Sequence, residues 1–502
     1  MELTELEQQR VKKLERLRAE GVEPYPRRVK RTHTLAQALA LLESTEANGE
    51  ASPQIAVAGR LRSVRIMGKV SFAHIEDESG TIQLFLRPQD VGEEIYDMFK
   101  QNFDLGDFVS AEGQVMRTRT GEPSVQVQQM HILSKAISPL PVIKEKEIDG
   151  KLVRYTEFSD AEERYRQRYA DLASNTEVRE VFRTRARIIQ ALRHFLDDHD
   201  FLEVETPILQ PIYGGAAARP FTTHHNQLHQ DLYLRIAFEL YLKRLLVGMY
   251  DRVYEIGHDF RNEGVSQKHN PEFTQLEFYA AYWDYNDVMA FCERMIAYVA
   301  EKVLDTTVIH YQGHKVDLSP PWRRITLRDA AIEVTGIDYL DYPTAEELIP
   351  AVRAKGLEAK SNATWGHLID KVLLDAVEPT LIQPTFVLDY PRDISPFAKT
   401  KLDDPKHVER FEFFIAGLEM GNAFSELNDP FDQEQRFQEA GRLYAPEDDE
   451  AHPMDMDYLR AMKYGMPPNG GFGMGVDRLT MLFTDKATIR EVILFPHLRT
   501  KE

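Results

Sequence analysis

Residues 253–279 read VYEIGHDFRNEGVSQKHNPEFTQLEFY, and the rest of the chain is organised around this stretch. Residues 253–260 are rich in β-branched and aromatic side chains, and residues 273–279 resume the same extended pattern. Residues 262–271, between them, collect turn formers. The stretch therefore predicts a strand, a loop and a second strand.

Alternation along the second strand predicts two different faces. Leu276 and Phe278 share one face, which suits a core. The other face is mixed aromatic and acidic: Phe273, Gln275, Glu277 and Tyr279. Charged side chains also gather around the loop: Arg261, Glu263, Lys268, His269 and Glu272. This combination suits a zwitterion bound beside a polyphosphate, although on these residues alone a solvated charged hairpin is the more common interpretation.

Size and composition limit the class of protein. A chain of 502 residues is too long for one ordinary core, so two or three domains are expected. Hydrophobic content of 43% and charged content of 28% are those of a folded soluble protein. No apolar run reaches membrane-spanning length and the charged start is unlike a secretory signal, so we expect a cytoplasmic protein without a membrane partner. The single cysteine, Cys292, is expected to be buried and inert.

Net charge argues against indiscriminate nucleic-acid binding. At −20, the surface as a whole repels phosphate, so a nucleic-acid partner needs local basic patches. Residues 55–138 provide them within five short extended runs and one helical piece, near residues 91–102. This is the pattern of an OB barrel, an oligonucleotide-binding fold, although another small β-barrel or sandwich fits it too. Its basic residues are Arg60, Arg62, Arg65, Lys69, Arg117 and Arg119.

The remaining chain divides by composition. Residues 1–54 are predicted to be a helical extension, with a weak apolar stripe over residues 2–20, and residues 139–174 a charged linker. Residues 175–502 form the second large domain, which begins with an amphipathic helix over residues 178–196. A strand, FLEVETPIL, follows and is interrupted by Pro207. A helical insert over residues 311–400 returns to the sheet at PTFVLDYP and needs no special function.

Two later segments carry further chemistry. Residues 410–429, RFEFFIAGLEMGNAFSELND, predict two strands around a turn at Ala416 and Gly417. Glu412 and Glu419 are an odd number of residues apart, so only folding at the turn brings them together. Such paired carboxylates are Mg²⁺ ligands by type, whereas an ordinary surface hairpin is the alternative. Residues 470–484, GGFGMGVDRLTMLFT, predict a glycine-rich strand end that enters a helix carrying Arg478.

These motifs resemble the class II aminoacyl-tRNA synthetases, and nearly the whole chain is similar to the bacterial lysyl-tRNA synthetases. FRNE and HNPEFT resemble motif 2 (residues 253–279), the helix and strand over residues 181–207 resemble motif 1, and residues 470–485 resemble motif 3. RIAFEL resembles the family signature R-x-A-P-E-L, with Phe238 in the place of the proline. The resemblance implies an α+β fold: an OB barrel followed by a catalytic domain built on an antiparallel sheet flanked by helices.

The resemblance also implies site residues. Catalytic roles fall to Arg261, His269 and Arg478. ATP-binding residues are Arg261, Glu263, His269, Asn270, Phe273 and Arg478. Lysine-binding residues are Gly215, Glu239, Arg261, Glu277, Tyr279, Asn422, Phe424 and Glu426. Glu412 and Glu419 hold more than one Mg²⁺ ion, motif 1 forms a homodimer, and Phe72, Gln83 and Glu122 bind the tRNA anticodon.

The pocket that the resemblance implies also indicates the substrate by its charge. Glu239, Glu277 and Glu426 exceed what one α-ammonium group needs, and the surplus calls for a second cation, which lysine carries. We therefore expect ATP-dependent formation of lysyl-adenylate, release of pyrophosphate, and transfer of lysine to tRNA(Lys). Two alternatives stay open: a tRNA-binding paralogue that has lost catalysis, and an enzyme that lysylates another acceptor.

Overall fold

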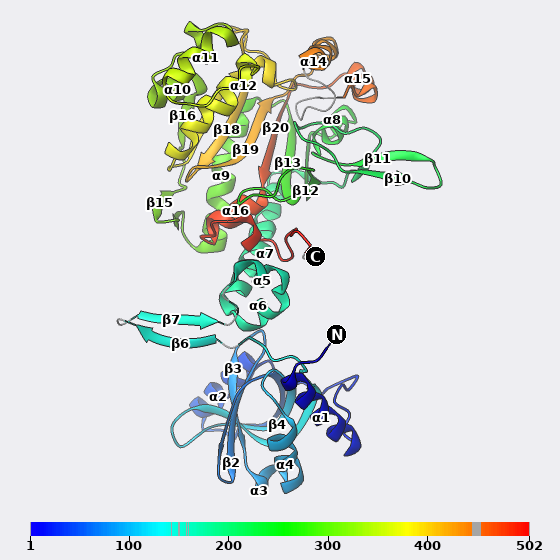
Figure 1. Cartoon of the computed structure of the whole chain (residues 1–502), viewed down its shortest axis with the longest axis vertical. Coiled ribbons are helices and arrows are strands. Elements are labelled where there is room, and N and C mark those ends of the chain that lie inside the picture. The colour runs from blue at the N-terminus through cyan, green and yellow to red at the C-terminus, as the bar shows by residue number, and fades with distance from the viewer. Residues whose placement is uncertain are drawn as a thin grey trace. The chain divides into compact units, whose positions relative to one another are not determined.

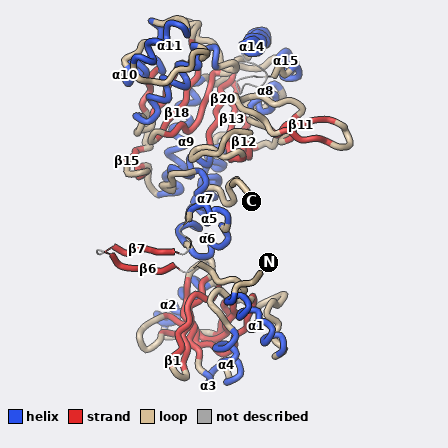
Figure 2. The backbone as a smooth tube through the Cα atoms, viewed as in Figure 1, coloured by secondary structure: helices blue, strands red, loops and turns tan. Residues whose placement is uncertain are grey.

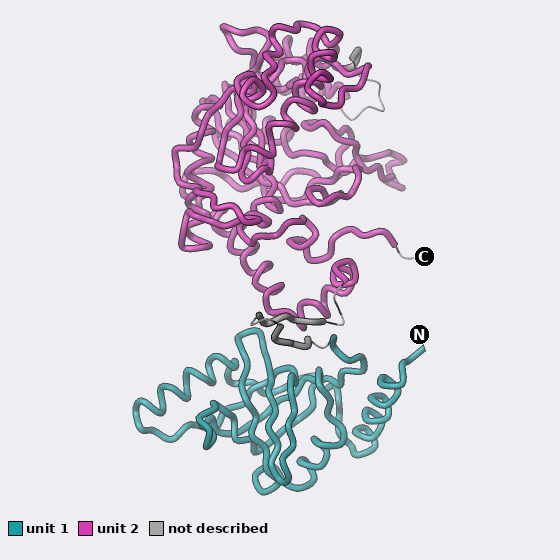
Figure 3. Tube along the Cα trace, turned by 60° about the vertical axis from the view of Figure 1, so that its left-hand side comes forward, with its two compact units in different colours: residues 1–159 teal, residues 160–502 magenta. Residues whose placement is uncertain are grey.

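A computed structural model describes residues 2–141, 143–148, 151–156, 158, 160–443 and 453–500. The chain divides into two compact units, Met1–Ser159 and Asp160–Glu502 (Figure 3). Parts of the predicted linker (residues 142, 149–150, 157 and 159) and residues 501–502 lie outside the described residues. In the part of the chain that the structure describes, no helix is long and apolar enough to cross a membrane.

The first unit is built on a closed five-stranded barrel with the strand order β1-β2-β3-β5-β4 (Figure 1). Its strands are β1 (Gln54–Met67), β2 (Val70–Glu76), β3 (Thr81–Leu86), β4 (Phe108–Arg117) and β5 (Pro123–Ser134). Its helices are α1 (Glu5–Ala19), α2 (Leu35–Asn48), α3 (Pro88–Val91) and α4 (Glu93–Asn102). Alternate residues of β2, such as Ala73 and Ile75, enter the barrel core. The predicted OB barrel is confirmed, but its helical piece is divided at Gly92, whose φ is +88°.

The N-terminal helix is shorter than predicted because capping fixes its start. Thr4 and Glu7 form a capping box that begins α1 at Glu5. Leu14 and Leu17 are buried, whereas Leu3 and Leu6 remain exposed. After the barrel, the described residues form a hairpin of β6 (Ile143–Ile148) and β7 (Lys151–Thr156).

The second unit is built on an eight-stranded sheet with the order β16-β17-β18-β19-β20-β13-β12-β8 (Figure 2). The strands are β8 (Leu202–Glu203), β12 (Arg252–Phe260), β13 (Glu272–Ala281), β16 (Arg323–Thr326), β17 (Thr385–Pro391), β18 (His407–Ile415), β19 (Leu418–Ser425) and β20 (Asn469–Gly475). All neighbouring pairs are antiparallel except β16–β17 and β12–β8. The predicted strands of residues 253–279 are therefore two interior strands of this sheet, β13 beside β20 and β12 beside the edge strand β8.

One face of the sheet packs against three helices: α7 (Thr176–Asp197), α9 (Tyr285–Leu304) and α16 (Val476–Phe483). Leu276 and Phe278 lie in this core, as alternation predicts. Phe278 stacks on Phe472 with a centroid separation of 4.8 Å and meets Phe291 edge-on. Cys292 is buried in the same core. The opposite face of the central strands is left for the cavity described below.

Other elements surround the sheet. They are α5 (Ala161–Arg166), α6 (Arg168–Ser174), β9 (Leu209–Gln210), β10 (Thr222–His225), β11 (Gln230–Leu234), α8 (Glu239–Val247), β14 (Val308–Tyr311), β15 (His314–Asp317), α14 (Pro430–Leu443), α15 (Met456–Lys463) and η5 (Ile489–Glu491). The strand predicted over FLEVETPIL forms only β8 and β9, with Pro207 between them.

The predicted helical insert contains short helices with a core of their own. These are α10 (Leu327–Thr335), η1 (Tyr339–Asp341), α11 (Ala345–Ala354), α12 (Trp365–Leu368), η2 (Ile369–Leu373), α13 (Leu374–Val377), η3 (Glu378–Thr380) and η4 (Arg392–Ile394). The segment also contributes β16 and β17 to the large sheet. It therefore extends the second unit rather than forming a separate one.

Truncation of Phe278 tests this core. We expect Phe278→Ala to lower the free energy of unfolding by about 3–5 kcal/mol, because it removes a fully buried ring from an aromatic cluster. Phe431→Ala is the control, since that ring is 73% exposed and its loss should change stability by less than about 0.5 kcal/mol. Trp283, Trp322 and Trp365 all lie in the second unit, so tryptophan fluorescence during urea denaturation reports on it. Equal losses in the two variants would contradict the packing described here.

Candidate active site

A cavity of about 580 Å³ opens on the face of the sheet opposite the aromatic core. Most of the residues predicted for the site line it: Gly215, Glu239, Arg261, Glu263, His269, Asn270, Phe273, Glu277, Tyr279, Glu412, Glu419, Asn422, Phe424 and Arg478. On β13, Phe273, Gln275, Glu277 and Tyr279 all reach the cavity, as the alternation predicts. Glu426 does not line it but lies buried behind Gly471.

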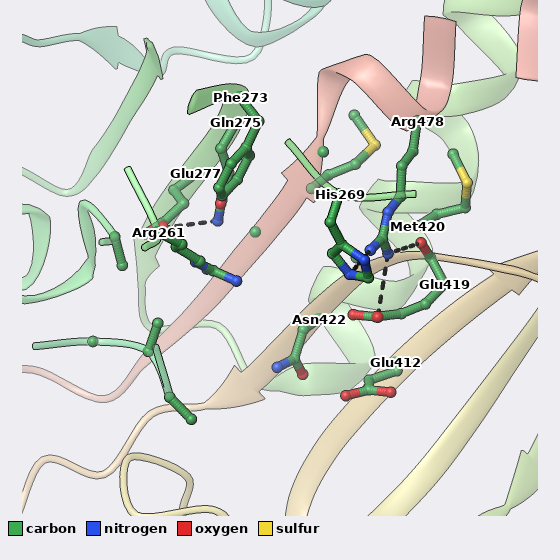
Figure 4. A pocket seen from close by; sticks show the side chains of 18 of the residues that line it. Arg261, His269, Phe273, Gln275, Glu277, Glu412, Glu419, Met420, Asn422 and Arg478 are labelled. Carbon is green, nitrogen blue, oxygen red and sulfur yellow. Dashed lines mark hydrogen bonds and ion pairs between the residues drawn. The ribbon is translucent and has the colours of Figure 1, made fainter. Parts of the chain in front are cut away.

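Arg478 and His269 lie together at one end of the cavity, and Arg261 lies apart from them, on the side of Phe273 and Glu277 (Figure 4). Arg478 donates from Nη1 to the carbonyl oxygen of Glu419 at 2.5 Å and to its Oε2 at 3.2 Å. Arg478 Nη2 lies 3.2 Å from His269 Nε2. The Arg261 guanidinium lies 5.1 Å from the centroid of the Phe273 ring, within cation–π range. The end of the cavity that holds Arg478 and His269 is suited to binding several anionic oxygens.

His269 is held as a neutral side chain in this setting. Partial burial and the neighbouring Arg478 both lower the pKa of His269. The ring is oriented from behind by Ser266, whose Oγ lies 2.9 Å from Nδ1. A neutral imidazole contributes hydrogen bonds to a ligand there without adding a further charge.

Glu412 and Glu419 meet through the hairpin of β18 and β19, as folding at the Ala416–Gly417 turn predicts. A register shift between Phe413 and Phe414 corrects the odd spacing, so both carboxylates reach the cavity. Burial, and then Glu419, raise the pKa of Glu412 to about 7. Against the effect of burial, Arg478 keeps the pKa of Glu419 below its ordinary value.

This pair fits a hard cation that takes its other ligands from elsewhere. Glu412 is fixed by Arg410, at 2.6 Å from Oε1, and by the Tyr390 hydroxyl, at 2.9 Å from Oε2. Within the described residues, no cluster of three or more His, Cys, Asp or Glu side chains could hold a metal ion alone. An ion at Glu412 and Glu419 would therefore need phosphate and water to complete its coordination.

The opposite end of the cavity is acidic, and its side chains are buried. Glu277 accepts hydrogen bonds at Oε1 from Gln275, at 2.9 Å, and from the backbone N–H of Phe238, at 3.2 Å. The Tyr279 hydroxyl donates to Glu277 Oε2 at 3.1 Å. Burial, then Asp259 and Glu239, raise the pKa of Glu277 well above its usual range. Phe238 thus supplies an N–H that a proline at this position would lack.

Gly215 and Glu239 are in close contact. Gly215 has φ of +89°, and a Cβ built on it would lie 2.9 Å from Glu239 Cβ and 3.2 Å from Ala237 Cβ. The loop therefore approaches the first turn of α8 as only a glycine allows. This contact fixes the side chain of Glu239 at the cavity wall.

Comparison with known proteins agrees with this arrangement. Residues 160–499 match the family described as tRNA synthetases class II (D, K and N), and residues 55–133 match the OB-fold nucleic acid binding domain. Similar curated relatives are lysine–tRNA ligases of three organisms. That of Roseiflexus castenholzii is 55% identical over 503 residues, covering 100% of both chains. That of Chloroflexus aurantiacus is 51% identical, covering 100% of this chain and 99% of the relative, and that of Dehalococcoides mccartyi is 48% identical, covering 99% and 98%.

The chain belongs to the class II tRNA synthetases. The segment that resembles motif 2 forms the pair β12 and β13 with its charged loop, and the segment that resembles motif 3 forms β20 leading into α16. Arg478 lies in the first turn of α16, from which its side chain reaches Glu419 on β19.

In the OB barrel, the three predicted anticodon residues lie on or beside neighbouring strands. Phe72 on β2 is partly buried and packs on Phe85, with a centroid separation of 5.4 Å. Gln83 on β3 is buried, and its Oε1 accepts a hydrogen bond from Ser124 at 2.8 Å. Glu122 is exposed, just before β5, and its Oε1 lies 2.8 Å from His74 Nε2.

The sequence reasoning missed several groups at the catalytic cavity. Lys243 lies beneath the acidic end, where its Nζ donates to Glu239 Oε1 at 2.6 Å and forms an ion pair with Glu426. The sequence does indicate this contact, because Glu239 and Lys243 are four residues apart on one helix, a spacing at which opposite charges pair.

The insert also contributes to the cavity, contrary to the view that it needs no special function. Its cavity-lining charged residues are Asp370, Lys371, Asp375 and Glu378. Glu378 accepts a hydrogen bond from Lys268 of the motif 2 loop at 2.6 Å. Asp370 and Lys371 lie in the π-helical turn η2, a distortion that is frequent at functional sites.

Gly471 provides a test of the acidic end. A Cβ at this position would lie 2.0 Å from Glu426 Oε1 and 2.4 Å from the Tyr279 ring, so Gly471→Ala must displace both. We expect amino-acid-dependent exchange of pyrophosphate into ATP to fall by about tenfold or more, and stability by about 1–3 kcal/mol. Gly475→Ala on the same strand is the control, because a Cβ at this position would lie no closer than 3.8 Å to the Arg478 side chain, an ordinary van der Waals contact. Undiminished exchange in Gly471→Ala would contradict the placement of Glu426 and Tyr279.

Proposed function

We infer that this synthetase activates L-lysine with ATP, releases pyrophosphate, and transfers lysine from lysyl-adenylate to the 3′ end of tRNA(Lys). The negative charge at the acidic end of the cavity is the observation that supports lysine as the amino acid. Three carboxylates, of Glu239, Glu277 and Glu426, surround it together with the ammonium of Lys243. When all four are ionised, two negative charges remain, which match the two ammonium groups of lysine. Lys243 thus neutralises one of the three carboxylates predicted for this pocket.

We place the substrate between the two ends. Arg261 lies near both Phe273 and Glu277 (Figure 4), so its planar fork can bind the α-phosphate and the amino-acid carboxylate together. Glu239 then binds the α-ammonium, while Glu277, Tyr279 and Glu426 bind the ε-ammonium. Gly215, Asn422 and Phe424 complete the pocket around the substrate's aliphatic chain.

ATP occupies the cationic end in this proposal. Phe273 and Arg478 enclose the adenine ring, Glu263 accepts from its amino group, and Asn270 and His269 approach the phosphates. An aspartate or asparagine substrate lacks the second ammonium, so it would leave the acidic end unpaired, which is costly in a buried site.

The chemistry needs no nucleophile from the chain. A carboxylate oxygen of lysine attacks the α-phosphorus, the bond to the bridging oxygen breaks, and pyrophosphate leaves with the electron pair. Arg261, Arg478 and His269 stabilise the charge on the transferring group, and orientation lowers the barrier further. A ribose hydroxyl of tRNA then attacks the lysyl carbonyl carbon, and AMP leaves. We propose that Mg²⁺, as more than one ion, binds at Glu412 and Glu419 and neutralises phosphate charge.

Partners follow from the same proposal. The OB barrel binds the anticodon, with Phe72 as a stacking platform and Gln83 and Glu122 as base-reading groups. A homodimer through motif 1 is supported by exposed apolar side chains beside the edge strand β8: Leu202, Ile208 and Leu209. Because tRNA and ATP are found there, we place the enzyme in the cytoplasm.

Exchange of pyrophosphate into ATP with each of the twenty amino acids tests the assignment. We expect lysine alone to support strong exchange, because only it satisfies both ends of the pocket, and we expect tRNA to be charged afterwards. The control is exchange without any amino acid. Binding of tRNA without lysine-dependent exchange would favour a paralogue that has lost catalysis, whereas exchange without tRNA charging would favour another acceptor.

Lysine affinity should depend on pH. Burial, opposed by Lys243 and assisted by Glu239, raises the pKa of Glu426 to about 8. Glu426 must lose its proton to pair with an ammonium group, so a lower pH weakens binding. From pH 8.5 down to 6.5 we expect the KM for lysine to rise by up to about tenfold per unit below pH 8, while the KM for ATP changes much less. Glu426→Gln should bind lysine weakly and lose this dependence; a flat wild-type profile would contradict the assignment.

A further inference from the structure

Lys243 is an internal cation placed under the amino-acid pocket. It lies on α8, one turn after Glu239, and its side chain is fully buried. Its Nζ lies 5.1 Å from the centroid of the Phe397 ring and 5.8 Å from that of Tyr279. Burial opposes its charge, but Glu239 and Glu426 outweigh this effect and raise the pKa of Lys243. Lys243 therefore carries a charged ammonium group that is buried away from solvent.

The two carboxylates that Lys243 contacts have different positions relative to the cavity. Glu239 lines it directly, and its Oε1 accepts a hydrogen bond from Nζ at 2.6 Å. Glu426 lies behind Gly471, with Oε2 in ion-pair contact with the same Nζ. Apart from this contact with Lys243, neither oxygen of Glu426 has a hydrogen-bond partner in the part of the chain that the structure describes. Glu426 is thus held in place by one ion pair and retains acceptor capacity for a ligand.

We propose that Lys243 is a positioning residue that sets the charge and geometry of the amino-acid pocket by bridging Glu239 and Glu426. The proposal rests on the proposed function, in which these two carboxylates bind the α-ammonium and the ε-ammonium of lysine. One internal cation therefore joins the groups that bind opposite ends of the substrate. Lys243 also neutralises one of the three carboxylates, so two cationic groups of a ligand balance the remaining charge. This balance favours a diamino acid.

Loss of this ammonium has a definite electrostatic consequence. The ionisable groups that face Lys243 and Glu426 come from α8, β13, α15 and the end of β19: Glu239, Glu277, Tyr279, Tyr458 and Glu426 itself. None of these other groups is a cation, so Glu239 and Glu426 would hold their protons to higher pH without Lys243. A protonated carboxyl group binds an ammonium group less well, and lysine affinity falls.

A purely structural role for Lys243 gives different expectations. A buried ion pair that only supports folding affects stability and, through disorder, all substrates together. A positioning role affects lysine selectively and acts through Glu426. These two possibilities are separable by a KM-against-kcat comparison, a pH profile and a double-mutant cycle.

The experiment compares Lys243→Met, Glu426→Gln, the double variant and Arg244→Met in the full-length enzyme. Arg244→Met is the matched control, because Arg244 is the adjacent helix cation and its Nη2 contacts Asp455 at 2.7 Å. Lysine-dependent exchange, KM values for lysine and ATP, and thermal melting are measured between pH 6.5 and 8.5. Wild-type exchange with lysine establishes the proposed function first, so a failure of that function appears before any variant is made.

We expect Lys243→Met to raise the KM for lysine by about 10- to 100-fold, with the KM for ATP changed less than about threefold. In Lys243→Met, the rise of the KM for lysine on acidification should begin at a higher pH than in the wild-type enzyme. In the Glu426→Gln background, Lys243→Met should raise the KM for lysine by a several-fold smaller factor than it does in the wild-type enzyme, because residue 426 is already neutral. Arg244→Met should leave the KM for lysine within about twofold, even if it melts earlier.

Two results would overturn the proposal. One is an unchanged KM for lysine in a folded Lys243→Met enzyme. The other is an equal and additive rise in the KM for lysine and ATP, in parallel with a lower melting temperature, which would make Lys243 a structural residue. If Lys243→Met does not fold, the double variant decides. A folded enzyme whose KM for lysine exceeds that of Glu426→Gln by less than about tenfold supports the bridge, and a selective rise of about 10- to 100-fold over Glu426→Gln contradicts it.

Discussion

Opposite charges at the two ends of one cavity are the constraint on which this structure depends. A guanidinium or carboxylate group in a low-dielectric site is costly unless it is paired, so the protein supplies internal partners before any substrate arrives. Arg478 is held by Glu419, and Glu277 accepts from Gln275, Tyr279 and the Phe238 amide. Each pairing leaves a charge poised for a ligand without leaving it unsatisfied in the free protein.

The fold allows this separation because the central strands use their two faces differently. Toward the helices, β13 and β20 present aromatic side chains, of which Phe278 and Phe472 stack directly. Toward the cavity, β20 presents glycines at 471 and 473, so that long side chains from β13 and β19 have room. The β18–β19 hairpin then adds Glu412 and Glu419 on the same side. A rigid sheet therefore fixes residues that are far apart in the sequence.

Local patterns predicted this framework well because they act over a few residues. The alternation in β13 identified both its core face and its cavity face, and the turn at Ala416 and Gly417 explained how two oddly spaced carboxylates meet. The interruption at Pro207 also appeared, although the flanking strands are only two residues long. These features follow from backbone geometry and side-chain periodicity alone.

Contacts between distant segments were harder to predict. Lys243 was overlooked because a helical lysine is normally solvated, and nothing local shows that Glu426 lies above it. The insert looked like a plain helical element, yet its turn near Lys371 forms part of the cavity wall, and Glu378 contacts the motif 2 loop. The burial of Gln83 was equally hard to predict, because its position beside Ser124 depends on the parallel pairing of β3 and β5.

A crystal structure of the enzyme with a stable sulfamoyl analogue of lysyl-adenylate tests the central claim most directly. We expect the ε-ammonium within hydrogen-bond distance of Glu277 and Glu426, and the adenine between Phe273 and Arg478. An ε-ammonium directed to solvent, or an analogue bound in the reverse orientation, would contradict it.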